Sequence, residues 1–186
     1  MSTRSYIAIE NTDKTIDAIY CHNDGYIENN GRLLNKYYQD PERVQELIAL
    51  GNLSSLGQQV EPDKYVQKYG FFYDSPEFVK LSMEEQMRIQ ESRTSCVAYH
   101  RDRGEDFRQL HFKNSRSFSI NCNDGMIDYF YLFKRDAKTG QWGWYAKSVF
   151  TGEYSYDLQK EVDTGLDMRR WHRLDRIIAK LDSQVA

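Results

Sequence analysis

The sequence contains few cysteines, and those present are arranged neither as disulfide pairs nor as metal ligands. Cys21, Cys96 and Cys122 lie far apart, are odd in number and form no CxxC pair. This spacing argues against a disulfide framework and against a zinc ribbon. Each cysteine lies in or beside a predicted strand, so we expect buried thiols that pack as small apolar side chains.

Long apolar runs are also missing. No stretch approaches the roughly 20 apolar residues that a membrane-spanning helix needs, and the N-terminal residues hold no apolar signal region. We therefore expect a cytoplasmic protein that does not contact a membrane. The net charge of −3 provides no overall basic surface for nucleic acid, although a local basic patch stays open as an alternative.

The common signatures of enzyme sites are absent as well. The chain holds no Walker loop, no GxGxxG, HExxH or GxSxG motif and no zinc-ligand spacing. We expect no cofactor and no bound metal. These absences favour a binding protein over an enzyme but do not decide between them.

Aromatic residues, in contrast, are plentiful at 14% of the chain. Each buries a large area, so they offset a modest aliphatic content. A length of 186 residues matches one domain. We predict a single α+β domain over residues 1–186, with a mixed, mainly antiparallel sheet and helices packed largely on one of its faces.

Residues 1–56 predict a β-hairpin followed by two helices. The hairpin strands are residues 6–10 and 16–21. The helices that follow carry apolar side chains at helical spacing. Their expected boundary residues are Asn29 or Asn30 for the first helix, and Asp40 with Pro41 at the start and Gly51 at the end of the second.

The middle of the chain predicts short helices. Residues 52–70 contain little regular structure beyond a helical turn at residues 65–69. A short helix is expected to begin at Ser75. Ser82 and Glu85 have the spacing of a capping box, so we expect a helix over about residues 83–92.

Residues 95–147 predict strands and a β-meander, and residues 166–182 a C-terminal helix. The strands are residues 95–100, 117–122, 126–133 and 141–146, with a turn at residues 123–125. Aromatic side chains fall on both faces of the meander, which indicates a sheet covered on part of each face. The last helix is predicted from the spacing of Leu174, Ile177, Ile178 and Leu181.

The most specific candidate site lies at the ends of two predicted strands. Its candidate catalytic residues are His22 and Asp24 after the first strand, and His100, Arg101, Arg103 and Glu105 after the second. If the strands are neighbours with matching ends, these side chains share one rim of the sheet. They would then bind a phosphate, with histidine as acid or base, or a divalent metal through His22, Asp24, His100 and Glu105. The simpler interpretation, which we favour, is ordinary turn chemistry with arginines paired to nearby carboxylates.

Two further stretches are candidate binding surfaces. The predicted last helix carries Arg169, Arg170, Arg173 and Arg176, which would meet nucleic-acid phosphates or else form a solvated helix face. Glu153, Tyr154, Tyr156 and Asp157 form an acidic, aromatic segment. It suits the basic surface of a protein partner, or else is a solvated loop.

Residues 6–56, with a strand that ends in YCHNDGY at 20–26, a helix with GRLL at 31–34 and the segment 42–57, together with residues 97–105, resemble a group of small proteins from phages and mobile elements that have no settled function. The resemblance covers about half of the chain and implies a phage setting in a host cytoplasm. It implies no catalytic residues. Phage accessory proteins often act against host defence, so we expect a protein that binds and inhibits a host protein or nucleoprotein complex. The alternatives are a phosphate- or nucleotide-directed enzyme that uses the rim, and a nucleic-acid-binding protein that uses the last helix.

Overall fold

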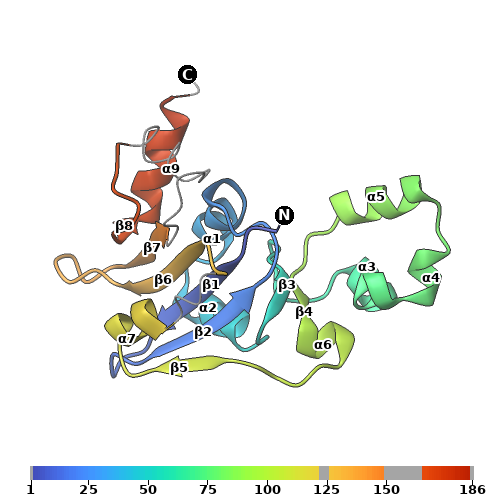
Figure 1. Cartoon of the computed structure of the whole chain (residues 1–186), viewed down its shortest axis with the longest axis horizontal. Coiled ribbons are helices and arrows are strands. Elements are labelled where there is room, and N and C mark those ends of the chain that lie inside the picture. Colours follow the sequence, from blue (N-terminus) through green and yellow to red (C-terminus); the bar gives the residue numbers. More distant parts are fainter. Residues whose placement is uncertain (1, 122–125, 149–164, 185–186) are drawn as a thin grey trace.

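The computed structural model describes residues 2–121, 126–148 and 165–184, and a mixed sheet of eight strands lies at its centre. Most strand pairs are antiparallel, which confirms the predicted α+β class (Figure 1). The strand order is β4-β3-β2-β1-β6-β7-β8, and β5 also pairs with β2. The strands are β1 (Ser5–Glu10), β2 (Ile16–Cys21), β3 (Leu53–Ser55), β4 (Val97–Ala98), β5 (Leu110–Phe112), β6 (Tyr129–Arg135), β7 (Trp142–Ser148) and β8 (His172–Arg173).

Strand β1 lies in the middle of the sheet and has two different neighbours. It forms the predicted antiparallel hairpin with β2, in which Tyr6 lies opposite Tyr20. On its other side it pairs with β6 in parallel, so that Tyr6 lies beside Phe130. Because side chains alternate between the two faces of a strand, this register fixes which residues share each face.

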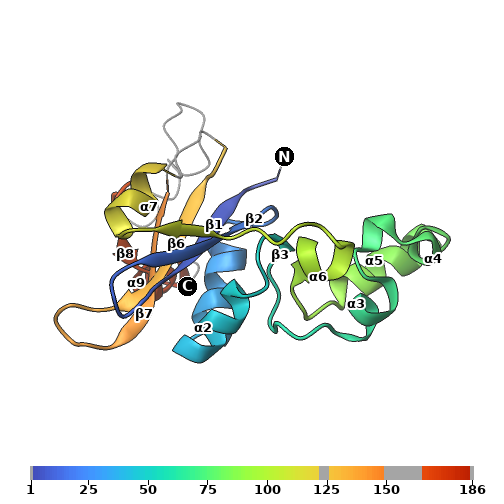
Figure 2. The ribbon, with the colours of Figure 1, turned by 90° about the horizontal axis from the view of Figure 1, so that it is seen from below.

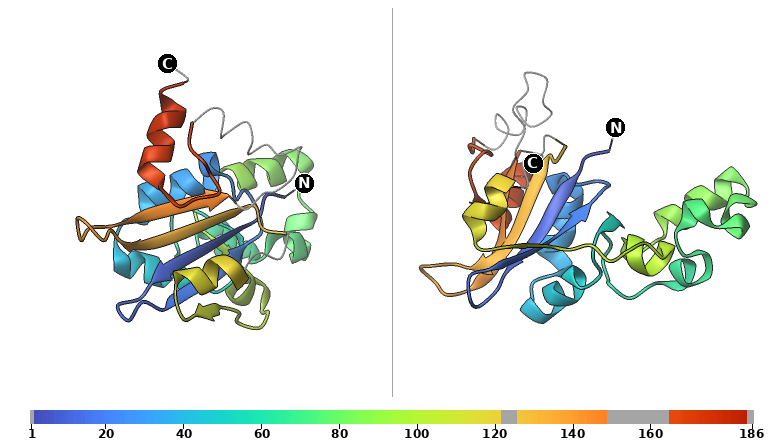
Figure 3. Two further views of the ribbon diagram at one scale, coloured as in Figure 1. Left: turned by 60° about the vertical axis from the view of Figure 1, so that its left-hand side comes forward. Right: turned by 60° about the horizontal axis from the view of Figure 1, so that its bottom comes forward.

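The two faces of the sheet are covered unequally. The larger core lies under the π-helix η1 (Ile27–Gly31) and the helices α1 (Arg32–Tyr37), α2 (Pro41–Ile48) and α9 (Leu174–Asp182). On the opposite face the described helix is α7 (Ser115–Asn121), whose Phe118 is fully buried against Phe130 (Figures 2 and 3). Helices therefore pack largely on one face, as the sequence predicts.

Local capping signals predict some helix starts and not others. Asp40 accepts hydrogen bonds from the backbone N–H groups of Glu42 and Arg43, which confirms it as the N-cap of α2. The predicted Asn cap of the first helix is wrong. Asn30 is fully buried inside η1, where its amide donates to the hydroxyl of Ser5 and to the thiol of Cys21.

Residues 62–94, here called the arm, extend away from the sheet (Figure 1). The arm contains α3 (Lys64–Tyr69), the 3-10 helix η2 (Phe72–Asp74), α4 (Pro76–Val79) and α5 (Met83–Glu91). It has a small core of its own, built around Val66, Tyr69, Phe72, Phe78 and Ile89. The capping box of Ser82 and Glu85 is present at the start of α5.

The strand predicted over residues 95–100 is shorter than expected, and its last two residues are helical. Val97 and Ala98 pair with β3, which offers only three residues as a neighbour, and Ser95 forms a single bridge with Gln59. The chain then turns into α6 (Tyr99–Arg103). Asp102 assists this turn, since its carboxylate accepts a hydrogen bond of 2.8 Å from the backbone N–H of Ala98.

Two other predicted elements are also corrected. Residues 115–121 form α7 where a strand was expected, because the side chain of Asn114 caps the helix by accepting from the N–H of Ser117 at 2.9 Å. The turn predicted at residues 123–125 lies outside the described residues. The C-terminal helix begins at Leu174 rather than at residue 166, because His172 and Arg173 pair with β7 as β8.

Candidate functional site

The rim predicted from two strand ends does not form. Strands β2 and β4 lie on either side of β3, with Cys21, Leu53 and Ala98 in register. However, β2 is parallel to β3 and β4 is antiparallel to it. The chain after Cys21 therefore continues beside Ser54, whereas the chain after Ala98 continues in the opposite direction beside Asn52.

Arg101 is a structural residue at the base of the arm. Its guanidinium donates to the carbonyl oxygens of Val60 and Cys96 and to the carboxylate of Asp102. Asp102 is almost fully buried, and its carbonyl oxygen accepts from the N–H of Phe71 at 2.9 Å. Together the two residues connect α6 to three other segments, and four of the five donors of the Arg101 guanidinium are used in these contacts.

The other members of the predicted rim have local partners. Arg103 pairs with Asp74 and with Glu105, and its guanidinium lies 4.9 Å from the ring centre of Phe71. His100 is exposed, and its Nδ1 lies 2.7 Å from the carbonyl oxygen of Glu105. These contacts agree with the interpretation of ion pairs and turn chemistry.

Asp24 is exposed and has the left-handed φ of 55° in the turn after β2. Gly25 follows because a side chain there would come within 2.9 Å of Ser5. No group of three His, Cys, Asp or Glu side chains within residues 2–121, 126–148 and 165–184 is placed to hold a metal ion. The metal site that the sequence suggested through His22, Asp24, His100 and Glu105 is therefore not formed.

His22 nevertheless has an informative environment on the sheet face that carries α7. Its Nδ1 lies 2.7 Å from the hydroxyl of Tyr20. Burial raises the pKa of Tyr20, and the nearby guanidinium of Arg4 acts against this rise. Arg4 was missed in the sequence, although its position two residues before Tyr6 in the same hairpin predicts that it shares this face.

The basic C-terminal residues do not form one helical stripe. Arg169 and Arg170 precede α9 and both pair with Asp167, at 2.8 and 3.3 Å. Arg173 pairs with Asp175 at 2.7 Å, and Arg176 is exposed on α9. The predicted acidic segment, with Glu153, Tyr154, Tyr156 and Asp157, lies outside the described residues.

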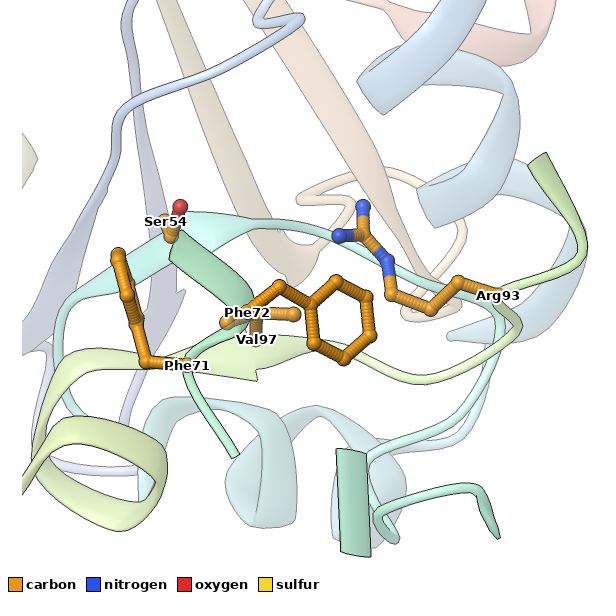
Figure 4. Close-up of a pocket in the computed structure, with 5 residues that line it drawn as sticks. All are labelled: Ser54, Phe71, Phe72, Arg93 and Val97. Carbon is orange, nitrogen blue, oxygen red and sulfur yellow. The ribbon is translucent and has the colours of Figure 1, made fainter. Parts of the chain in front are cut away.

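A small pocket lies between the arm and the sheet. Figure 4 shows its lining residues Ser54, Phe71, Phe72, Arg93 and Val97. Its volume of about 10 Å³ has room for about one water molecule. The guanidinium of Arg93 lies 5.9 Å from the ring centre of Phe72. The pocket is a packing gap rather than a substrate site.

The outer side of the arm exposes apolar side chains. Val79, Met83 and Met87, here called the methionine patch, are 61%, 76% and 54% exposed. Met83 and Met87 are one helical turn apart on α5 and so lie on one face. Gln86 donates to the carbonyl oxygens of Val79 and Leu81, which places the end of α4 against α5.

Helix α5 also contributes little to the arm's own core. Among its nine residues, Ile89 is the buried one. A helix that leaves most of its surface in solvent, with two methionines outward, has an apolar face available to another molecule. Methionine is frequent at such surfaces because its flexible side chain adapts to a partner.

Comparisons with known proteins assign no family to this chain. No protein-family model matches it, and neither a curated protein nor a solved structure is significantly similar. In the described part of the chain, no helix is long and apolar enough to cross a membrane. The assignment of function therefore depends on the surfaces described above.

Proposed function

We propose that this chain is a phage-type accessory protein that acts by binding, and that the methionine patch is its contact with a component of host defence. The observation that supports the proposal is the exposure of Val79, Met83 and Met87 on a helical arm that extends from the sheet. Contiguous apolar side chains on a soluble domain usually mark an interaction surface.

The charge around the patch indicates the chemistry of the partner. Residues 76–91 carry four carboxylates, which are Glu77, Glu84, Glu85 and Glu91, and two cationic side chains, which are Lys80 and Arg88. An apolar centre with an acidic rim is complementary to an apolar pocket with a basic rim. The proposed partner is therefore a host protein with basic residues around an apolar cleft.

The test combines an infection assay with a binding assay. A bacterial host that carries a defence locus is infected with a sensitive phage, with and without expression of the chain. The wild type should restore plaque formation, and Met83→Glu with Met87→Glu should abolish it. Both substitutions lie on exposed positions, so the melting temperature should stay within a few degrees of the wild type.

The matched control is Ile120→Glu. Ile120 is 62% exposed, but it belongs to α7, which lies on the sheet rather than in the arm. It should leave restoration of plaques unchanged. Equal activity of the double variant and the wild type would contradict the proposal. Binding of the purified defence component should be lost in the double variant and retained in the control.

A further inference from the structure

Three residues form a polar row across the ends of neighbouring strands. The pairing of Ser5 with Cys21 places Arg4 opposite His22. The backbone N–H of His22 donates to Leu53 at 3.0 Å, which brings His22 beside Ser54. Because strand side chains alternate, Arg4 and His22 share the face that carries Tyr6 and Tyr20.

The second row on this face is aromatic and adjoins the first. Tyr6 and Tyr20 are directly opposite each other, with ring centres 6.1 Å apart. The hydroxyl of Tyr20 reaches back to Nδ1 of His22 at 2.7 Å. Tyr99 also lies near Tyr20 and Ser54. The polar row therefore has hydroxyl groups on its inner side.

Arg4 is a cation without a counter-ion in the described part of the chain. Its Nε is buried there and has no hydrogen-bond acceptor. The carboxylate of Asp128 accepts from the backbone N–H of Arg4 at 2.7 Å, but no ion pair joins it to the guanidinium of Arg4 within the described residues. A buried donor that lacks an acceptor is costly, and a partly buried charge without a partner costs more.

His22 provides a second free donor at the same place. Its Nδ1 is used by Tyr20, and no described residue hydrogen-bonds to its Nε2. A guanidinium and an imidazole on one face of the sheet, both beside the hydroxyl of Tyr20, form a donor set for an oxyanion. The planar guanidinium fits two oxygens of a phosphate at once.

We propose that Arg4 and His22 bind the phosphate group of a small phosphate monoester, with the hydroxyl of Tyr20 donating to Nδ1 of His22 and so holding the proton of the neutral imidazole on Nε2. The adjacent rings of Tyr6 and Tyr20 offer an aromatic surface for the remainder of the ligand. This site is separate from the methionine patch and does not depend on the proposed protein contact. It also differs from the rim expected from the sequence, because His100, Arg101 and Arg103 take no part in it.

The experiment is calorimetric titration of the full chain at low salt with inorganic phosphate, adenosine 5′-monophosphate and adenosine. Phosphate and the monophosphate should bind, and adenosine should not. Arg4→Ala should weaken both by at least tenfold, and His22→Gln by several-fold. Lys138→Ala is the control, because this lysine lies in the turn after β6, at the opposite end of the sheet.

A second readout reports directly on the imidazole. In a phosphate titration followed by NMR at constant pH, the imidazole ring signals of His22 should shift in the wild type and stay unchanged in Arg4→Ala. Should Arg4→Ala lower the melting temperature, Arg4→Lys serves as the second variant, with binding weakened several-fold. The proposal is overturned by no binding at millimolar phosphate, by equal binding of adenosine, or by loss of binding in Lys138→Ala rather than in Arg4→Ala.

Discussion

The carboxylate of Asp63 accepts a hydrogen bond of 3.0 Å from the backbone N–H of Thr94, 31 residues further along the chain. The same oxygen accepts from Ser95 at 3.3 Å. The other oxygen accepts from Tyr65 and Val66, in the first turn of α3. One side chain therefore caps the first helix of the arm and also binds the segment that leaves its last helix.

Replacing Asp63 should separate these two roles. In Asp63→Asn the remaining oxygen can still cap α3, but the amide would face the N–H groups of Thr94 and Ser95. We expect the free energy of unfolding in urea to fall by about 1–2 kcal/mol. Asp40→Asn is the matched control, because Asp40 acts only as an N-cap and asparagine caps equally well. Equal losses in both variants would contradict the double role.

The same carboxylate should make the arm sensitive to acid. Burial acts to raise the pKa of Asp63, but hydrogen bonds from four backbone N–H groups outweigh it and lower the pKa from 3.8 to about 2. The contribution to stability is then complete above about pH 4 and is lost as the pH falls through the folded value. The difference in unfolding free energy between the wild type and Asp63→Asn should shrink between pH 5 and pH 2. A difference that stays constant would show that Asp63 is not the titrating group.

Gly57 is the glycine with the closest backbone neighbour. A Cβ there would lie 2.3 Å from the carbonyl carbon of Ser95 and 2.6 Å from the nitrogen of Cys96. Gly57→Ala must move one of these two backbone segments, so we expect a loss of about 3 kcal/mol, measured by chemical denaturation. Gly104→Ala is the comparison, because its φ of 73° is strained for alanine but no atom lies within 4 Å. It should lose only about 1 kcal/mol, and the reverse order would refute this packing argument.

Arg101 and Arg103 should respond differently to the same substitution. A lysine at position 101 cannot reach the carbonyl oxygens of Val60 and Cys96 together with Asp102, so Arg101→Lys should lower the unfolding free energy by about 2 kcal/mol. Arg103→Lys should change it little, because its ion pairs are exposed. Thermal melts of both variants provide the measurement. If Arg101→Lys failed to restore plaque formation but kept the stability of the wild type, Arg101 would instead have a functional role.

The elements that the sequence predicts correctly are those specified by neighbouring residues. The hairpin of β1 and β2 follows from two short apolar runs around a polar turn. Helices α2 and α5 follow from Asp40 and from Ser82, whose side chains satisfy the first backbone donors of each helix. Such signals act within a few residues, so they do not require knowledge of the tertiary structure.

The errors concern residues whose structure is decided by distant contacts. The alternation of Phe118 and Ile120 resembles a strand, but only Phe118 faces the sheet, while Ile120 is exposed. Arg173 was assigned to a helix and instead pairs with Tyr145 of β7. The sequence of residues 166–173 alone does not show that β7 lies beside this segment.

The candidate site shows the same division. His22 was identified from its place after a strand. Whether His100 lies beside it depends on the relative direction of β2 and β4, which local sequence does not encode. Arg4 could have been found, since the hairpin register follows once the turn is known. Whether a carboxylate pairs with its guanidinium depends on Asp128 beside β6, which is remote in the sequence.

The central position of β1 also has a consequence for synthesis of the chain. Arg4 and Asp128, at the start of the parallel pair of β1 and β6, are 124 residues apart. At a ribosomal rate of roughly 5–20 residues per second, β1 waits on the order of ten seconds for this neighbour. During that time one edge of the hairpin has no partner strand and is open to other nascent chains. Pairing of β1 with β6 is therefore a long-range closure, and non-local strand pairing of this kind slows folding.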